Sequence, residues 1–125
     1  MKWRYVLPLA LSIFLLVALV SAEGGKATQV SGFVIDSACA FTKNLDKPIS
    51  RDCAVKCAKA GSPLVILSDD KTVYWPVADT VPASSQNAKL LPFAGERVKV
   101  SGTVYDRGGS KAMVIDKIEG EAAKK

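Results

Sequence analysis

The sequence predicts a mainly β fold: a small five-stranded barrel with a short cysteine-bearing helix and a second short helix. Several short stretches alternate apolar and polar residues, as strands with one buried face do. Turn residues such as Gly, Asp and Pro separate these stretches. The chain of 125 residues is long enough for one small domain behind its N-terminal segment.

The N-terminal segment has the pattern of a signal peptide. Residues 1–4 are a short basic start, residues 5–20 are uncharged and mostly aliphatic, and small residues follow. We therefore expect residues 1–22 to be cleaved, the protein to be periplasmic or secreted, and no stable membrane anchor to remain. The alternative is an uncleaved anchor, although Pro8 and Ser12 interrupt the apolar run.

The mature chain is expected to contain a flexible lead-in over 23–28, an OB-fold-like domain over 29–119 and a disordered tail over 120–125. Within the domain we expect strands at 30–35, 64–67, 72–77, 96–105 and 112–118, and helices at 51–60 and within 87–94. Ser50 is the expected N-cap of the first helix.

The order of these elements favours one type of barrel. Five short strands with a helix between the third and the fourth is the order of an OB-fold. Gly32 and Gly102 lie within strands, where glycine allows the sharp bend that closes a small barrel. The alternative is a flat sheet packed by one helix.

Composition excludes several kinds of function. The chain has no His, which excludes Ser-His-Asp and Cys-His catalysis and any imidazole metal site. It has 17 Lys and Arg against 12 Asp and Glu, but Lys2 and Arg4 leave with the signal peptide. The remaining basic residues are spread along the chain, so we expect no nucleic-acid partner. We also expect no cofactor and no hydrolytic activity, since no convincing general base is present.

The three cysteines are the most concentrated chemistry in the chain. Cys39 lies at the end of the first strand, and Cys53 and Cys57 lie one turn apart on the face of the predicted helix that we expect to point inward. In an oxidising compartment we expect one structural disulfide, from Cys39 to either Cys53 or Cys57, with one thiol left over. Such a bond would stabilise the fold by about 2–4 kcal/mol. A bond between Cys53 and Cys57 would be strained within one helix.

Two alternatives use the cysteines as reduced thiols. The third thiol can make the disulfide exchangeable, and the helix N-terminus beside Cys53, with the charge of Lys56, favours a reactive thiolate. Three thiolates can instead hold a soft ion such as Cu(I) or Zn(II), with Asp36 or Asp52 as a further ligand.

A candidate binding face is formed by outward-pointing residues of two strands. Its members are Tyr74, Arg97, Lys99 and Tyr105. The outer strand face of an OB-fold is where oligosaccharides and oligonucleotides bind. Trp75 lies on one face of a strand with Val73 and Val77, so we expect it in the core. We expect Asp69 and Asp70 to be solvated charges of a turn.

Four segments carry a resemblance to a family of small exported bacterial proteins. They are Val-x-Gly-x-Val-x-Asp-Ser-x-Cys at 30–39, Asp-Cys-Ala-x-Lys-Cys-Ala-Lys-x-Gly at 52–61, Leu-Val-Ile-Leu at 64–67, and Leu-x-Pro-Phe-Ala-Gly-x-Arg-Val-Lys-Val-Ser-Gly-Thr-Val at 90–104. The resemblance implies an OB-fold-type domain of unassigned function behind a signal peptide. Members of this family often carry a His between the first two cysteines, where this chain has Thr42, Lys43 and Asn44. A metal site shared with them is therefore not implied.

These observations lead to one expected function and one alternative. We expect an exported, non-enzymatic OB-fold-like module, stabilised by one disulfide, that binds a small molecule, a glycan or an envelope protein. The alternative is a periplasmic protein that exchanges disulfides or carries a soft metal through Cys39, Cys53 and Cys57.

Overall fold

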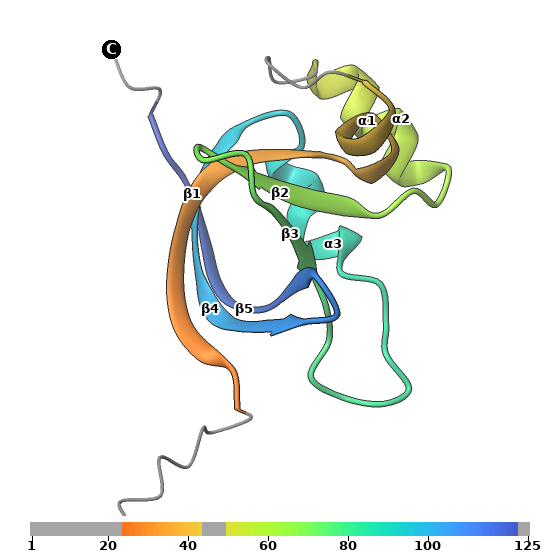
Figure 1. Ribbon diagram of the computed structural model, residues 1–125. Helices are drawn as coiled ribbons and strands as arrows, with labels where there is room; N and C mark the ends of the chain where they lie inside the picture. Colours follow the sequence, from red (N-terminus) through yellow and green to blue (C-terminus); the bar gives the residue numbers. More distant parts are fainter. Residues whose placement is uncertain (1–23, 44–49, 123–125) are drawn as a thin grey trace, which may run out of the picture.

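Five strands close into a barrel in the computed structural model, which describes residues 24–43 and 50–122 (Figure 1). They are β1 (Lys26–Asp36), β2 (Leu64–Ser68), β3 (Val73–Pro76), β4 (Arg97–Arg107) and β5 (Ser110–Gly120). Their order around the barrel is β1-β2-β3-β5-β4. Only β3 and β5 run parallel among these neighbours. The predicted OB-fold-like barrel is thereby confirmed, and the predicted signal peptide lies outside the described residues.

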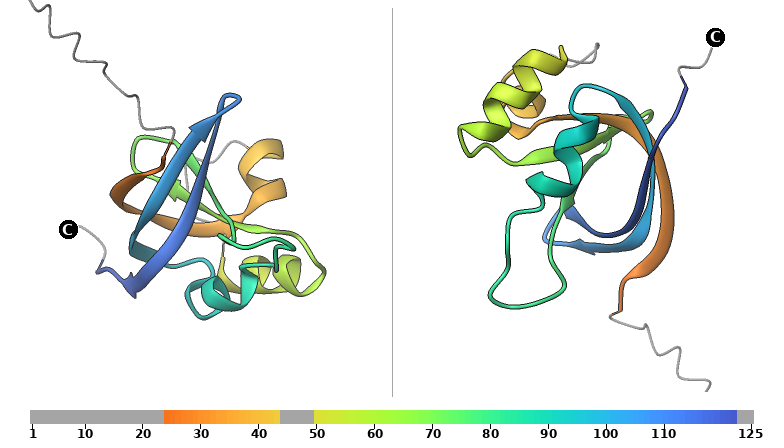
Figure 2. Two further views of the ribbon diagram at one scale, coloured as in Figure 1. Left: turned by 90° about the horizontal axis from the view of Figure 1, so that it is seen from below. Right: turned by 180° about the vertical axis from the view of Figure 1, so that it is seen from behind.

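Two short helices lie at one end of the barrel (Figures 1 and 2). They are α1 (Ser37–Thr42), directly after β1, and α2 (Arg51–Lys59); α3 (Asn87–Leu90) and the 3-10 turn η1 (Leu91–Phe93) precede β4. Ser50 caps α2 as predicted, since its hydroxyl accepts a hydrogen bond from the Cys53 N–H at 3.2 Å. The sequence pattern does not predict α1. The pattern predicts that the first strand ends at Cys39. Instead, a helix begins after Asp36, whose carboxylate caps it by accepting a hydrogen bond from the Cys39 N–H at 2.9 Å.

Alternate strand residues fill the barrel interior. The buried cluster comprises Val30, Val34, Leu64, Ile66, Val98, Val100, Met113 and Ile115 from the strands, with Ala54, Ala58, Leu90 and Ala94 from the segments between them. The inward face of α2 is therefore Ala54 and Ala58, whereas the sequence pattern predicts that Cys53 and Cys57 face inward. The physical reason is size, because two alanines one turn apart let α2 lie close against the barrel. The thiols of Cys53 and Cys57 therefore lie to the side of the contact between α2 and the barrel.

A second apolar cluster lies on the outside of the barrel. Its buried members are Ile35, Val65 and Leu67, with Phe33, Ala40, Val73 and Trp75 packed against them. Val73 and Trp75 are thus on the outer face of β3, while Tyr74 packs against the interior cluster. The predicted assignment of the two faces of β3 is wrong. Because α1 partly covers this outer face, β2 is apolar on both sides, and alternation alone cannot tell the two faces apart.

Two strand glycines sit where neighbouring strands approach closely. A Cβ atom on Gly32 would lie 2.2 Å from the Leu67 carbonyl oxygen, and one on Gly102 would lie 2.0 Å from the Val114 carbonyl oxygen. The ladder between β4 and β5 also shifts register between Ser101 and Gly102. Both positions therefore require glycine for the barrel to close.

The strands at the two ends of the domain are longer than the sequence pattern indicates. β1 begins at Lys26, inside the segment expected to be a flexible lead-in. β5 continues to Gly120, and the Glu121 N–H donates to the Arg97 carbonyl oxygen at 2.9 Å, so the expected tail begins as part of the sheet. Among the described residues, no helix is long and apolar enough to cross a membrane.

Candidate functional site

The structure does not bring the four residues of the predicted binding face together. Tyr74 lies on the opposite face from Arg97, Lys99 and Tyr105, since it packs against the barrel interior. It lines an open hollow of about 240 Å³ with residues 29–31 and 68–70. The prediction fails because it depends on the face that β3 turns outward.

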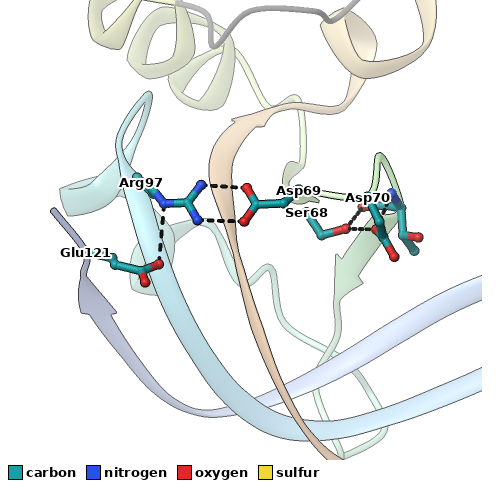
Figure 3. Close-up of polar contacts among 6 residues, drawn as sticks. Ser68, Asp69, Asp70, Arg97 and Glu121 are labelled. Atoms are coloured by element: carbon teal, nitrogen blue, oxygen red, sulfur yellow. Dashed lines mark hydrogen bonds and ion pairs between the residues drawn. The ribbon is translucent and has the colours of Figure 1, made fainter. Parts of the chain in front are cut away.

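Arg97 is held by its neighbours and is not a free surface charge. Its guanidinium pairs with the Asp69 carboxylate through two contacts of 2.6 Å, and Figure 3 shows the two side chains meeting across β1. It also lies over the Phe33 ring, 5.7 Å from the centroid. Glu121 Oε2 lies 3.5 Å from Arg97 Nε, and these two buried atoms have no hydrogen-bond partner among the described residues. We call these four residues the Arg97 clamp.

The clamp ties the chain end to the turn between β2 and β3. The Arg97 side chain is 9% exposed, and the hydrogen bonds to Asp69 raise the pKa of its guanidinium. The neighbouring turn is also ordered by hydrogen bonds, because Asp70 accepts from the Ser68 hydroxyl and from the Thr72 N–H. The Ser68 hydrogen bond is the main cause of a lowered pKa at Asp70. Asp69 and Asp70 are exposed charges of the turn, as predicted, and they also hold an ion pair and hydrogen bonds that order it.

An aromatic pair lies on the outer face of β3, where Trp75 belongs to the same outer apolar cluster as Phe33 of the clamp. Phe41 on α1 is 66% exposed and stacks on Trp75 of β3, with ring centroids 5.7 Å apart and an interplanar angle of 18°. The pair borders a hollow of about 300 Å³, lined also by Thr72, Val73, Gly109, Ser110 and Lys111. We call this feature the aromatic hollow. Its lining combines two aromatic residues, the hydroxyl-bearing Thr72 and Ser110, and one lysine.

Three separate elements build the aromatic hollow. α1 carries Phe41 over the outer face of β3. The parallel pairing of β3 with β5 sets Trp75 opposite Ala112 and thereby brings the turn of the β4–β5 hairpin beside the rings. Lys111 is oriented by an ion pair with Asp106, whose hydrogen bond raises the pKa of Lys111. The lysine is therefore a cation at neutral pH.

Sequence reasoning misses this site. Trp75 alternates with apolar neighbours and indicates the core, and Phe41 stands in a short segment without a clear period. The one available signal is that Phe41 stands just before a polar loop, and this does not identify Trp75 as its partner. Only the turn into α1 after Asp36 brings Phe41 to Trp75.

The three cysteines lie at the end of the barrel where α1 and α2 meet β1 and β2. Cys39 on α1 and Cys57 on α2 are half-buried, Cys53 is exposed, and no two sulfurs are at disulfide distance. Each of Cys53 and Cys57 raises the pKa of the Cys39 thiol, and Cys53 also raises the pKa of the Cys57 thiol. We call these residues the thiol cluster. The structure thus places the three thiols close enough to influence one another.

A buried carboxylate lies beside the thiol cluster. Asp36 is 1% exposed, and its oxygens accept hydrogen bonds from the Cys39 N–H and from the Ser62 hydroxyl. Burial, followed by the charge of Asp36 and a hydrogen bond to it, raises the pKa of Cys39 to about 11. Burial and then Asp36 also raise the pKa of Cys57. Both thiols are therefore protonated at neutral pH.

The predicted soft-metal site has no support from this geometry. Within residues 24–43 and 50–122, no group of three or more Cys, Asp or Glu side chains is arranged to hold a metal ion. Asp36, expected as a further ligand, instead caps α1 and accepts from Ser62.

Comparison of the chain with protein-family models, with curated proteins and with solved structures found no match.

Proposed function

We propose that this chain is an exported, non-enzymatic binding module that takes a glycan or a sugar-like small molecule in the aromatic hollow. The observation that carries the proposal is the exposed Phe41 ring stacked on Trp75 beside a hollow of about 300 Å³. Large aromatic side chains that stay exposed on an ordered surface commonly belong to binding sites.

The place of the hollow in the fold supports this proposal. OB-folds bind their ligands on the outer face of the second and third strands, between the connections β1–β2 and β4–β5. In this chain Val73 and Trp75 lie on the outer face of β3, Phe41 lies in the β1–β2 connection, and Lys111 follows the β4–β5 turn. The aromatic hollow therefore occupies the position expected for a ligand.

The chemistry of the lining favours a sugar. The apolar face of a sugar ring packs against an aromatic face, while its hydroxyl groups need hydrogen-bond partners. Phe41 and Trp75 supply the rings, and Thr72, Ser110 and Lys111 supply hydroxyl and ammonium groups at the same hollow. An apolar ligand would displace water from these polar groups without replacing its hydrogen bonds.

The expected disulfide is part of the same proposal. A bond from Cys39 to Cys53 or Cys57 would join α1 to α2, and α1 also carries Phe41. The bond would limit the positions that α1 can adopt over Trp75 and so preorganise the aromatic hollow. The sulfurs must move closer together for this bond to form.

The test is ligand-observed NMR of the full chain with a panel of soluble mono- and oligosaccharides. We expect at least one sugar to bind, and Phe41→Ala and Trp75→Ala to weaken binding about tenfold or more. Val81→Ala is the matched control, since Val81 is an exposed apolar residue (97%) outside the hollow. If no sugar binds, or if Val81→Ala weakens binding as much as Phe41→Ala, the proposal is wrong.

A further inference from the structure

The β4–β5 hairpin holds an arginine beside the aromatic hollow. Arg107 is the last residue of β4, and its partner in the strand register is Ser110, the first residue of β5. Ser110 is one of the residues that line the hollow. Directly paired residues of antiparallel strands have Cα atoms about 4.5–5.5 Å apart. Arg107 is therefore separated from the lining of the hollow by a single strand spacing.

The strand register also places Arg107 on the face of the barrel that carries the hollow. Trp75 on β3 pairs with Ala112 on β5, and Ala112 pairs with Tyr105 on β4. Paired residues of neighbouring strands point to the same face of a sheet, as do residues two apart in one strand. Trp75, Tyr105 and Arg107 consequently share the outer face. The guanidinium of Arg107 lies over the Tyr105 ring, 5.7 Å from the ring centroid, which agrees with this placement.

Tyr105 limits the positions of the Arg107 side chain. The Tyr105 ring lies against the backbone just before β1, since a Cβ atom on Gly25 would be 2.9 Å from its Cζ atom. A guanidinium is attracted to the face of such a ring. Arg107 is exposed but is held in this way beside the hollow, so it loses less side-chain freedom when it binds an anion.

The charges around the hollow favour an anionic ligand. Its described lining contains one lysine and no acidic residue. Within the part of the chain that the structure describes, the residues that line the hollow or adjoin its lining in the turn and the hairpin include three bases and two acids. They are Lys71, Arg107 and Lys111 against Asp70 and Asp106. Because Asp106 forms an ion pair with Lys111, the charge of this lysine is already partly balanced.

We propose that the aromatic hollow selects a sugar that carries a carboxylate, such as a uronic acid, and that Arg107 binds this carboxylate. Tyr105 is a positioning residue, because it acts through Arg107. The inference rests on the proposed binding of a sugar at Phe41 and Trp75, and it names the class of sugar.

A uronic acid has the two kinds of surface that this site offers. The apolar face of its ring packs on an aromatic side chain, as that of a neutral sugar does. Its carboxylate is planar and accepts two parallel hydrogen bonds from a guanidinium. Lys111 suits this group less well, because Asp106 already contacts its ammonium and because lysine presents a point charge without a planar fork. Phe41 and Trp75 thus serve both classes of sugar, and Arg107 supplies the preference for the acidic class.

The first experiment compares matched sugars on the full chain by ligand-observed NMR titration at neutral pH. The pairs are the methyl glycosides of galactose and galacturonic acid and those of glucose and glucuronic acid, whose members differ only in a hydroxymethyl group or a carboxylate. We expect the acidic member of at least one pair to bind about tenfold or more tightly than its neutral partner. The preference should decrease as salt is added. If the two members of each pair bind equally, this inference is wrong and the proposed sugar binding stands. If no sugar binds, both are wrong.

The second experiment tests Arg107 through the ratio of the acidic to the neutral affinity. Arg107→Gln removes the guanidinium and should lower this ratio about fivefold or more. Lys117→Gln is the matched control, since it removes a positive charge from a side chain of β5 that is 68% exposed and lies outside the hollow. It should change the ratio by less than about twofold. The assignment is overturned if Arg107→Gln keeps the preference, or if Lys117→Gln lowers it as much.

The third experiment tests the positioning role of Tyr105. Tyr105→Phe keeps the ring under the guanidinium and should keep the acidic preference, whereas Tyr105→Leu removes the ring and should lower the preference about twofold or more. Urea unfolding shows whether the leucine variant is folded. A ratio that is the same in the folded leucine variant as in wild type would contradict this role. Loss of the preference in Tyr105→Phe would contradict it as well, because the ring is still present.

Discussion

On the outer face of β4, Arg97 is contacted by an acidic residue on either side and by a ring beneath, whereas on the outer face of β3 the rings of Trp75 and Phe41 remain partly open. Both regions look similar as sequence, because each combines aromatic and basic residues in or beside a strand. They differ in how many contacts their side chains already make with other residues of the chain. In the Arg97 clamp the charge of Arg97 is paired with Asp69 and Glu121. In the aromatic hollow the exposed part of the aromatic rings is available to a ligand.

This difference shows that residue type alone does not locate a binding surface. A basic residue on a strand is available to a ligand only if no acidic neighbour reaches it first. Asp69 and Glu121 reach Arg97 from the β2–β3 turn and from the chain end, two places that are distant in sequence. Phe41, by contrast, stacks on Trp75 and still remains 66% exposed.

The largest expected effect comes from the barrel that both regions share. Gly102→Ala places a Cβ atom 2.0 Å from the Val114 carbonyl oxygen, so the backbone of β4 or β5 must shift. We expect the free energy of unfolding to fall by more than about 3 kcal/mol. Urea unfolding measures this change. Gly120→Ala is the control on β5, since no atom lies within 4 Å of its added Cβ, and an equal loss there would contradict the steric argument.

The next largest effect on stability is expected at Arg97, in comparison with the neighbouring charge of Lys99. Arg97→Ala leaves the Asp69 and Glu121 carboxylates without their cation, and we expect a loss of about 2 kcal/mol because the carboxylates are only partly buried. Lys99→Ala, on the same face of β4, should change the free energy of unfolding by less than about 0.5 kcal/mol. Thermal or urea unfolding of both variants measures the difference. Equal effects would mean that the clamp is an ordinary surface ion pair.

The thiol cluster should give a smaller, pH-dependent effect. The pKa of Cys39 is about 11 in the folded protein against an ordinary 9.0, so the folded state holds this proton more tightly than the unfolded state. The resulting stability is complete below pH 9 and is lost as the pH rises toward 11. With the thiol partly exposed, we expect a loss of about 1 kcal/mol. Unfolding of reduced wild type and Cys39→Ser at pH 8 and pH 10.5 tests this, and the variant should lack that part of the decline.

The smallest expected effect sharpens the contrast with the clamp. Phe41→Ala removes a ring that is 66% exposed, so little buried apolar area is lost and stability should fall by less than about 1 kcal/mol. Urea unfolding of this variant beside Arg97→Ala makes the comparison direct. A loss of about 3 kcal/mol at Phe41 would show that this ring is part of the core, and the aromatic hollow would lose its main support.

Several features could be predicted because they depend on local pattern. The strict alternation of 97–105 requires one buried face, and the structure buries Val98 and Val100 there. Ser50 caps α2, and Gly32 and Gly102 lie where strands approach too closely for a side chain. Each of these consequences follows from a residue and its immediate neighbours.

The candidate site could not be predicted because it depends on how separate elements meet. Val73, Tyr74 and Trp75 have the same alternation whichever way β3 faces, and the covering of its outer side by α1 decides the outcome. The aromatic hollow likewise needs α1, β3 and the β4–β5 turn at once.

By itself, therefore, the sequence determined the barrel type, the order of its elements along the chain and its closing glycines, since alternation, turns and steric limits act over a few residues. Only the tertiary structure decided that Arg97 pairs with Asp69 and Glu121, that Phe41 meets Trp75, and that Ser62 donates a hydrogen bond to Asp36. The physical reason is that burial and electrostatic pairing depend on distance in space, and the closed barrel brings together residues that are far apart along the chain.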